Sequence, residues 1–325
     1  MKSVKNANRV HKKLCASVNY LQIDHRVKNI FQVEGVIILP SPKAWERYNW
    51  TRKYFEKKPK EGYFIWIKKQ VNFPLFACVS ISLKNITQEL QNLLIIEKNL
   101  NIKLRGTCNA LKKNLSGIHR AQGKIILKEN SSLKYNHIHT WGEKDIVEPN
   151  YQFFLEKNSK LDYTYRTLFT PKKLKINTLF NLLKGASCNV KIVANCSQTE
   201  TVMIKDVLIL KEKGASGIIK LRLVGRKNSQ ILACSQIIAE SESRGHLDCR
   251  GLLVDKKSKI ALIPELLCKN KLAQITHEAS LGKVSEEELN YLRMRGLTEK
   301  EAINLIINGF LEVKENKSSF PPSLS

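Results

Sequence analysis

Short polar turns recur along this 325-residue chain at nearly regular intervals. Successive turn positions are separated by 31, 28, 27 and 29 residues, and each is an asparagine or glycine, which tolerates positive φ at a tight corner: Asn99, Asn130, Asn158, Gly185 and Gly214. The intervening segments are rich in Ile, Val, Leu, Phe and Tyr, which is typical of β-strands. A period in this range is typical of solenoids, in which each coil packs only against its neighbours. The pattern predicts a β-helix or a stack of hairpin-like layers, although a β-sandwich would give a similar strand spacing.

The texture of the sequence divides the chain into four parts. We expect an N-terminal helical and mixed region at residues 1–75 and a β-helix core at residues 76–276. A C-terminal helical region is expected at residues 277–313 and a flexible tail at residues 314–325. In the first part, Ser41–Lys57 is expected to be helical, because Pro42 suits a first helical turn and Pro59 lies beyond the end. Its aromatic residues are expected to pack in a core.

Two capping boxes predict the C-terminal helices. Ser285 with Glu288 opens the first helix and Thr298 with Glu301 the second, and Gly296 suits the left-handed cap between them. Helical spacing predicts that the apolar faces are formed by Leu289, Tyr291 and Leu292 in the first helix and by Ala302, Leu305, Ile306 and Phe310 in the second. Such a hairpin could seal the open edge of a solenoid, since exposed edge strands invite aggregation, and its outer face would be free for a partner protein.

The charge balance leaves two interpretations open. The chain has 55 Lys and Arg against 29 Asp and Glu, a formal net charge of +26. A basic β-solenoid could bind nucleic acid or another polyanion. However, the lysines are spread evenly and no basic stripe is interleaved with stacking aromatics, which favours a solvated basic surface.

Several classes are disfavoured by missing motifs. No apolar run approaches the roughly 18–20 residues of a membrane span, and no secretory signal is evident, so a cytoplasmic location is expected. The basic, acid-free start of the chain keeps an organellar location open. No phosphate-binding loop is present, so we do not expect this chain to hydrolyse nucleotides.

The cysteines and histidines suggest two possible metal sites. The eight cysteines form no CxxC pair, which argues against a zinc finger. Cys249 and His277 are 28 residues apart, about one coil, and could lie on adjacent rungs, with Glu278 beside the histidine. Arg250 next to Cys249 should favour the thiolate, the form that binds soft metals.

The second possible site is weaker. It combines Cys108 with His119, further towards the N-terminus. His137 and His139 alternate so that both face one side of a strand, a conceivable metal pair, but a solvated face is the preferred interpretation.

The C-terminal sequence resembles the signature of the SufB/SufD family, the scaffold subunits of the SUF machinery for iron–sulfur cluster assembly. The matching segments are Pro264-Glu265-Leu266, residues 276–302 beginning Thr-His-Glu-Ala-Ser-Leu-Gly, and Ile306-Ile-Asn-Gly-Phe-Leu311. Upstream agreement extends through residues 245–253, His139-Thr-Trp-Gly142, Gly106-Thr-Cys108 and Leu21-Gln-Ile-Asp-His25.

The resemblance implies a right-handed parallel β-helix whose C-terminal helices dock the ATPase subunit SufC. It also implies pairing with a second SufB- or SufD-like subunit through the β-helix end, where a transient [4Fe-4S] or [2Fe-2S] cluster would be assembled from iron and a sulfur donor, with a flavin conceivable in the full complex. Cys249 matches the SufB-like cysteine, His277 the interface histidine and Glu278 the acid beside it, and Cys108 is the further metal candidate. The residues expected to contact SufC are Glu288, Tyr291, Leu292, Arg295, Gly296 and Phe310.

Two departures from the family pattern are visible. The chain is shorter than typical bacterial SufB and resembles the compact members of the family. It lacks the N-terminal multi-cysteine stretch of the longer SufB proteins. An adaptor that docks SufC without carrying a cluster is a further alternative.

Overall fold

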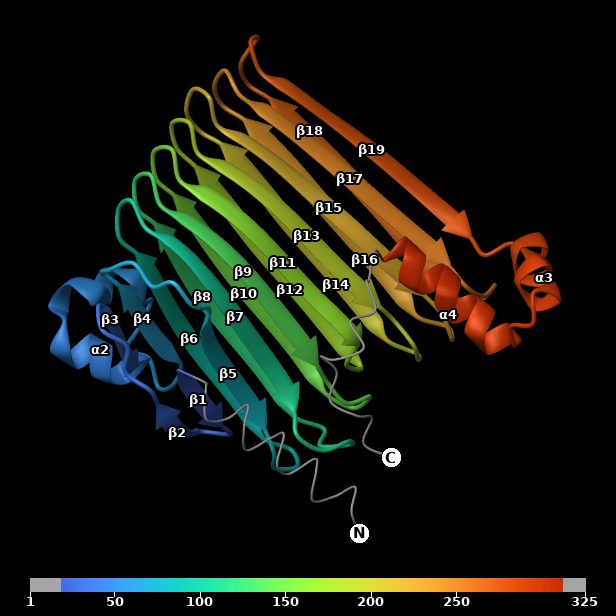
Figure 1. The fold of residues 1–325 in the computed structure, drawn as a ribbon, viewed down its shortest axis with the longest axis horizontal. Coiled ribbons are helices and arrows are strands. Elements are labelled where there is room, and N and C mark those ends of the chain that lie inside the picture. Colours follow the sequence, from blue (N-terminus) through green and yellow to red (C-terminus); the bar gives the residue numbers. More distant parts are fainter. Residues whose placement is uncertain (1–18, 312–325) are drawn as a thin grey trace.

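Two β-sheets wind together into a solenoid in the computed structural model, which describes residues 19–311 (Figure 1). In spatial order, the first sheet contains β2 (Arg26–Ile30), β1 (Tyr20–Ile23), β5 (Leu75–Ile81), β7 (Asn101–Ala110), β9 (Ser132–Thr140), β11 (Lys160–Phe169), β13 (Ser187–Asn195), β15 (Ser216–Gly225), β17 (Arg244–Leu253) and β19 (Gln274–Lys283). The second contains β3 (Val36–Pro40), β4 (Tyr63–Ile67), β6 (Thr87–Ile96), β8 (Ile118–Leu127), β10 (Ile146–Leu155), β12 (Lys173–Leu182), β14 (Thr201–Leu210), β16 (Gln230–Ala239) and β18 (Lys259–Cys268).

The chain alternates between the two sheets from β4 onward, so sheet neighbours are two strands apart in sequence and run parallel. Parallel neighbours need a crossover, and here the crossover is the strand of the opposite sheet. This connectivity confirms the predicted parallel β-solenoid with C-terminal helices and excludes the β-sandwich.

The recurring corners have the backbone geometry that their residues predicted. Asn99, Asn130 and Asn158 have φ of 62°, 57° and 56°, and Gly185 and Gly214 have φ of 64° and 77°. The asparagines also form a ladder along the stack, because the Nδ2 of Asn130 donates to the Oδ1 of Asn99 and that of Asn158 to the Oδ1 of Asn130, both at 3.2 Å. One residue type therefore supplies both the turn conformation and a bond between coils.

The N-terminal region extends both sheets instead of forming a separate layer. β1 pairs in parallel with β5 and antiparallel with β2, while β3 pairs antiparallel with β4. The helix expected over Ser41–Lys57 is a short α2 (Ser41–Arg47) followed by the 3₁₀ turn η1 (Asn49–Tyr54). Its aromatic residues pack against Phe64 and Trp66 of β4, as predicted. Residues 1–18 lie outside the described part.

The C-terminal helices start later than expected. The strand β19 continues to Lys283, because it pairs with β17 along its whole length, so His277 is a strand residue and the helical region begins with α3 (Glu286–Met294) and α4 (Glu299–Phe310). Ser285 accepts a hydrogen bond from the Glu288 amide, and Thr298 and Glu301 form a complete capping box. No helix within residues 19–311 is long and apolar enough to cross a bilayer.

The helices do not seal the solenoid edge. Ile307 and Leu311 pack against outward-facing Val193, Val224 and Leu252, so α4 covers part of the outer face of the first sheet. The predicted apolar faces are therefore correct only in part. Ala302 is buried as expected, but Tyr291 and Leu305, which were expected to face inward, are 54% and 52% exposed. The expected tail at 314–325 lies outside the described residues.

Candidate functional site

The last coil, formed by β18 and β19 and here named the terminal coil, leaves both sheets open. Among the described residues 19–311, β18 pairs only with β16 and β19 only with β17, so each has one edge without a sheet partner there (Figure 1). Four large apolar side chains are also exposed there, to between 43% and 66%: Ile263, Leu267, Leu272 and Leu281. An unpaired edge with exposed apolar side chains is the usual form of a surface that pairs with another chain.

Cys249 and His277 lie at this end and on the same face of the first sheet. The register pairs Cys249 with Ala279 and His277 with Leu247, so the coil length here is 30 residues and the expected 28-residue stacking is wrong by two positions. Diagonal neighbours of this kind have Cα atoms about 8 Å apart. Both side chains share the inward face with Leu247, but Cys249 is only 2% exposed while His277 lies open beyond it.

Glu278 faces the opposite side of β19 from His277, because successive strand residues alternate. Its carboxylate lies 3.5 Å from the Arg250 guanidinium, which bonds Asp248, and Asp248 in turn holds the buried Arg222 at 2.6 Å and 3.0 Å. The expected ligand set of Cys249, His277 and Glu278 is therefore not brought together within a single chain.

The Cys249 thiol is protonated in this structure. Burial raises its pKa to about 11, and the carboxylates of Asp206 and Asp248 act in the same direction, whereas Ser235 and Arg222 oppose the shift. The expectation that the Arg250 charge would give a thiolate is wrong, because burial outweighs the opposing effect of Arg222 and the Arg250 guanidinium bonds Asp248. Binding of a metal at Cys249 thus requires a base and a change of environment.

Asp206 and Ser235 are site residues that sequence reasoning missed. Both face inward on β14 and β16, and both lie close enough to Cys249 to shift its pKa. One Asp206 oxygen accepts from Thr178, but its Oδ2 and the Ser235 Oγ are buried and have no hydrogen-bond partner in the described part of the chain. Burial raises the pKa of Asp206 to about 7. The sequence does contain a signal for Asp206, because strand alternation puts it on the same inward face as Val202, Ile204 and Leu208.

The substitution Asp206→Asn should change how stability depends on pH. The folded-state pKa of about 7 lies above the ordinary 3.8, so the folded chain retains a proton that the unfolded chain releases. The stability contribution is complete below about pH 4 and is lost as pH rises through 7. Between about pH 4 and pH 7, the free energy of unfolding of the native chain should therefore fall by about a few kcal/mol relative to that of the Asp206→Asn variant. Urea unfolding at several pH values measures it, with Asp162→Asn as control, since the Asp162 side chain is 46% exposed. Parallel curves for the native chain and D206N would contradict the account.

The second candidate site is assembled inside the solenoid. Cys108, His119, His137 and His139 are all buried, with exposed fractions of 6%, 0%, 1% and 1%. The Cys108 Sγ lies 3.6 Å from the His137 Nε2, which lies 2.9 Å from the His139 Nε2. Among the described residues, these three form the one group of three or more Cys, His, Asp or Glu ligand atoms within 4.8 Å of one another. The preferred interpretation of a solvated His137–His139 face is wrong, because both side chains are buried and the register neighbours of His137, Gly106 and Tyr165, face the interior.

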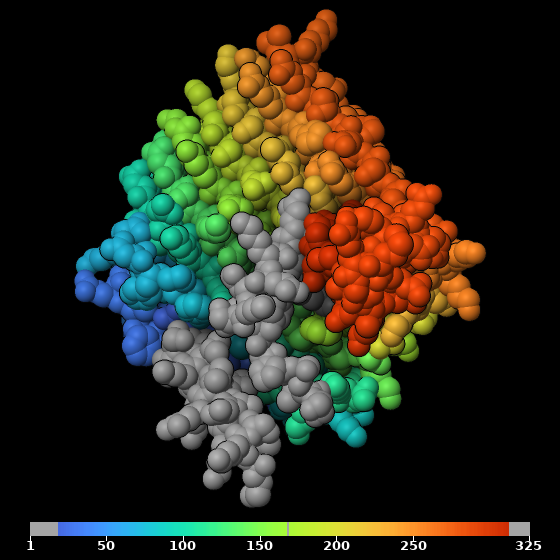
Figure 2. All heavy atoms as spheres, turned by 45° about the vertical axis from the view of Figure 1, so that its right-hand side comes forward, coloured from blue at the N-terminus to red at the C-terminus, as the bar shows by residue number. Residues whose placement is uncertain are grey.

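The C-terminal helices stand out from the solenoid surface (Figure 2). Of the residues expected to contact a partner, Glu288, Tyr291, Arg295 and Gly296 are exposed, whereas Leu292 and Phe310 are half-buried. The Arg295 guanidinium lies 5.3 Å from the centre of the Tyr291 ring. Exposed Met294 and Leu305 add apolar area to these helices.

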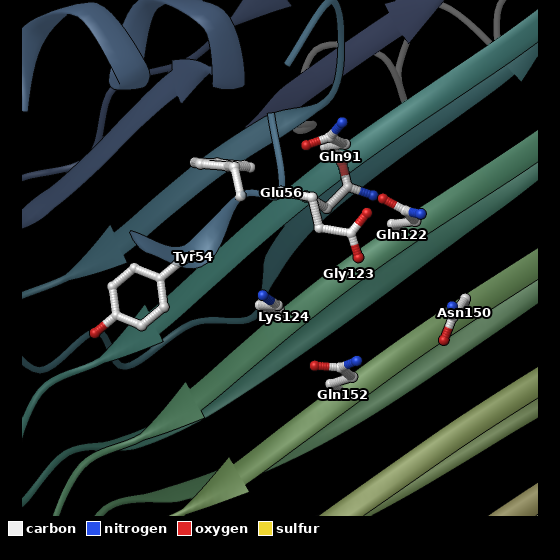
Figure 3. A pocket seen from close by; sticks show the side chains of 10 residues that line it. Tyr54, Glu56, Gln91, Gln122, Gly123, Lys124, Asn150 and Gln152 are labelled. Atoms are coloured by element: carbon white, nitrogen blue, oxygen red, sulfur yellow. The ribbon is translucent and has the colours of Figure 1, made fainter. Parts of the chain in front are cut away.

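A shallow pocket lies on the second sheet beside η1 (Figure 3). Half of its lining residues carry amide side chains, and the lining includes one acid, Glu56, and one base, Lys124. The lining contains no cysteine or histidine, so it offers none of the soft ligands found in the two clusters above.

The comparisons with known proteins agree with this architecture. Residues 80–310 match the family model described as "SUF system FeS cluster assembly, SufBD core domain". An iron–sulfur cluster assembly SufBD family protein of Archaeoglobus fulgidus is 27% identical over 91% of this chain and 84% of its own length. Similar relatives from Methanothermobacter thermautotrophicus and Methanocaldococcus jannaschii are 26% and 29% identical over 90% and 78% of the chain, and 76% and 78% of their own lengths. This chain belongs to the SufBD family of iron–sulfur cluster assembly proteins.

Proposed function

We propose that this chain is a scaffold on which a transient iron–sulfur cluster is assembled, at the terminal coil, between two paired subunits. The observation that carries the proposal is the open end of the solenoid, where Cys249 and His277 share one face beside unpaired strand edges. The cluster is the cargo, so an exposed imidazole and a single thiol suit it better than a closed set of four thiolates. The chain itself needs no catalytic group for this role.

Pairing of two subunits would continue both sheets across the interface. The free edges of β18 and β19 offer backbone donors and acceptors, and Leu272 and Leu281 offer apolar area. In such a pair, each His277 would lie near the partner subunit. This places the imidazoles and the two Cys249 residues around a shared space.

Loading requires the Cys249 proton to leave. The thiol is buried, and the nearby Asp206 carboxyl, with a pKa of about 7, is a group that can accept the proton near neutral pH. We propose that nucleotide-driven movement of bound SufC-like ATPases twists the paired solenoids and opens the Cys249 environment. The contact of α4 with β13, β15 and β17 gives this movement a mechanical route.

Replacing Tyr291 by Ala should weaken binding of the cognate SufC-like ATPase. The ring is 54% exposed and is held against Arg295, the kind of pre-ordered aromatic anchor that dominates interfaces. A loss of about 2 kcal/mol or more corresponds to roughly 30-fold weaker binding. Calorimetry measures it, with the equally exposed Phe73→Ala at the far end of the solenoid as control. Equal affinities for Y291A and F73A would remove the helices from the docking surface.

Anaerobic reconstitution with iron and sulfide tests the function itself. A scaffold should acquire a labile chromophore, and Mössbauer spectra separate [4Fe-4S] from [2Fe-2S]. A chain that docks the ATPase but gains no cluster would be an adaptor. Steeply salt-dependent binding of RNA or DNA without either activity would support the polyanion-binding alternative. The sulfur donor and any flavin would be identified in the purified complex, for which we propose a cytoplasmic location.

A further inference from the structure

A cluster of one thiol and three imidazoles lies inside the solenoid, away from the terminal coil. Cys108 of β7, His137 and His139 of β9 and His119 of β8 form it, and we name it the internal Cys–His cluster. One inward register line runs from His137 through Tyr165, Ile192 and Leu221 to Cys249. Four strand spacings correspond to about 19 Å, so the two sites are separate.

Two distances within this cluster are close to those of tetrahedral coordination. With the usual zinc–sulfur and zinc–nitrogen bonds, two ligands of a tetrahedral site lie about 3.6 Å apart for S and N and about 3.3 Å apart for two N. The Cys108 Sγ–His137 Nε2 distance is 3.6 Å, and the His137 Nε2–His139 Nε2 distance is 2.9 Å. Separation of the His137 and His139 rings by about 0.4 Å would bring their Nε2 atoms to the tetrahedral spacing.

His119 presents a free lone pair. The Gln88 Nε2 donates to the Asp24 carbonyl, which turns the Gln88 Oε1 toward His119 at 2.8 Å. Since an amide oxygen only accepts, the His119 Nδ1 carries the proton and its Nε2 is the bare nitrogen. That Nε2 is buried and has no hydrogen-bond partner within residues 19–311. Burial lowers the pKa of His119 and His137 to about 3, so both rings are neutral, the form that binds metals.

We propose that the internal Cys–His cluster binds one zinc-like divalent ion through the Cys108 Sγ and the His137 and His139 Nε2 atoms, the residues whose ligand atoms lie within 4.8 Å of one another. The His119 Nε2 lies outside this group and would complete the set after a movement of its ring. A mixed sulfur and imidazole set suits Zn²⁺. The cluster is closed and buried, which is the arrangement of a structural site. The Tyr163 hydroxyl, 3.3 Å from the His137 Nδ1, and Gln88 support the outer nitrogens.

Binding changes two protons. Cys108 loses its thiol proton to solvent as the S–metal bond forms. The Trp141 Nε1 donates to the His139 Nδ1 at 3.1 Å, so the metal-free His139 carries its proton on Nε2. Ligation through Nε2 moves that proton to Nδ1, and the Trp141 indole must turn away. The emission of Trp141 therefore reports occupancy of this site.

The test uses the full chain produced in cobalt-supplemented medium, so that the ion is bound as the buried site folds. The Cys249→Ala, Cys268→Ala background removes the thiol of the terminal coil, Cys268, and the thiol of the neighbouring β17, Cys249. We expect about one cobalt per chain, tetrahedral visible bands and a thiolate-to-cobalt charge-transfer band. Cys108→Ser should lose the charge-transfer band and His119→Asn should lower the metal content, whereas the buried Cys188→Ser of β13 should change neither. The cobalt-dependent change in emission should disappear in Trp141→Phe.

Two results would overturn the proposal. The first is the absence of the charge-transfer band in the Cys249→Ala, Cys268→Ala chain that retains Cys108. This result would exclude ligation by Cys108 even if C108S fails to fold. The second is a band that persists in folded C108S. Neither result bears on the terminal coil, because cluster loading at Cys249 is measured separately in a chain that retains it.

Discussion

Replacing Cys249 by Ala is expected to abolish cluster loading during anaerobic reconstitution. The thiol is, in the proposal, the sulfur ligand that each subunit brings to the shared space, and no other cysteine of the described residues lies on its inward register line. His277→Ala should leave a cluster that forms but is lost faster to a chelator, because one ligand of a labile set is missing.

The control for this prediction is Cys188→Ala, which removes an equally buried thiol from β13. Iron and sulfide content and the visible absorption band measure the outcome for all variants. A full cluster in C249A would end the assignment of Cys249, and an unchanged release rate in H277A would end that of His277.

Replacing Leu281 by Lys is expected to convert paired subunits into monomers. Leu281 is 51% exposed on the inward face of β19, beside the free strand edge. A charge placed without a partner in a buried interface is unfavourable by about 3–5 kcal/mol, which corresponds to a loss in affinity of roughly 100-fold or more.

Light scattering across a dilution series measures this change. Leu83→Lys is the matched control, since Leu83 is 58% exposed in a turn at the opposite end of the solenoid. The account predicts that L83K dimerises like the native chain. A dimer of undiminished stability in L281K would place the pairing surface elsewhere.

The fold was largely predictable because the strongest restraint is local. A corner needs a residue with positive φ once per coil, and Asn99, Asn130, Asn158, Gly185 and Gly214 mark it in the sequence. Thr298 and Glu301 likewise mark a helix start through contacts within four residues. Turn and cap chemistry of this kind does not depend on distant parts of the chain.

The site was predicted less well because it depends on register and on which strand face is inward. Coil lengths vary, so 28 residues separate Cys249 from Leu221 but 30 separate it from Ala279. The alternation of His137 and His139 correctly predicted that they share one face of the strand. Their polarity suggested that this face is solvated, but it points into the solenoid. Asp206 was missed for the same reason, since an acid on an inward phase contradicts the usual pattern of buried strands.

Native mass spectrometry of the anaerobically reconstituted chain tests the central claim most directly. Assembly between terminal coils predicts one cluster for each pair of subunits, no cluster on monomeric L281K, and none on C249A despite normal pairing. A complete cluster on single chains, or a cluster on L281K at the native level, would contradict it.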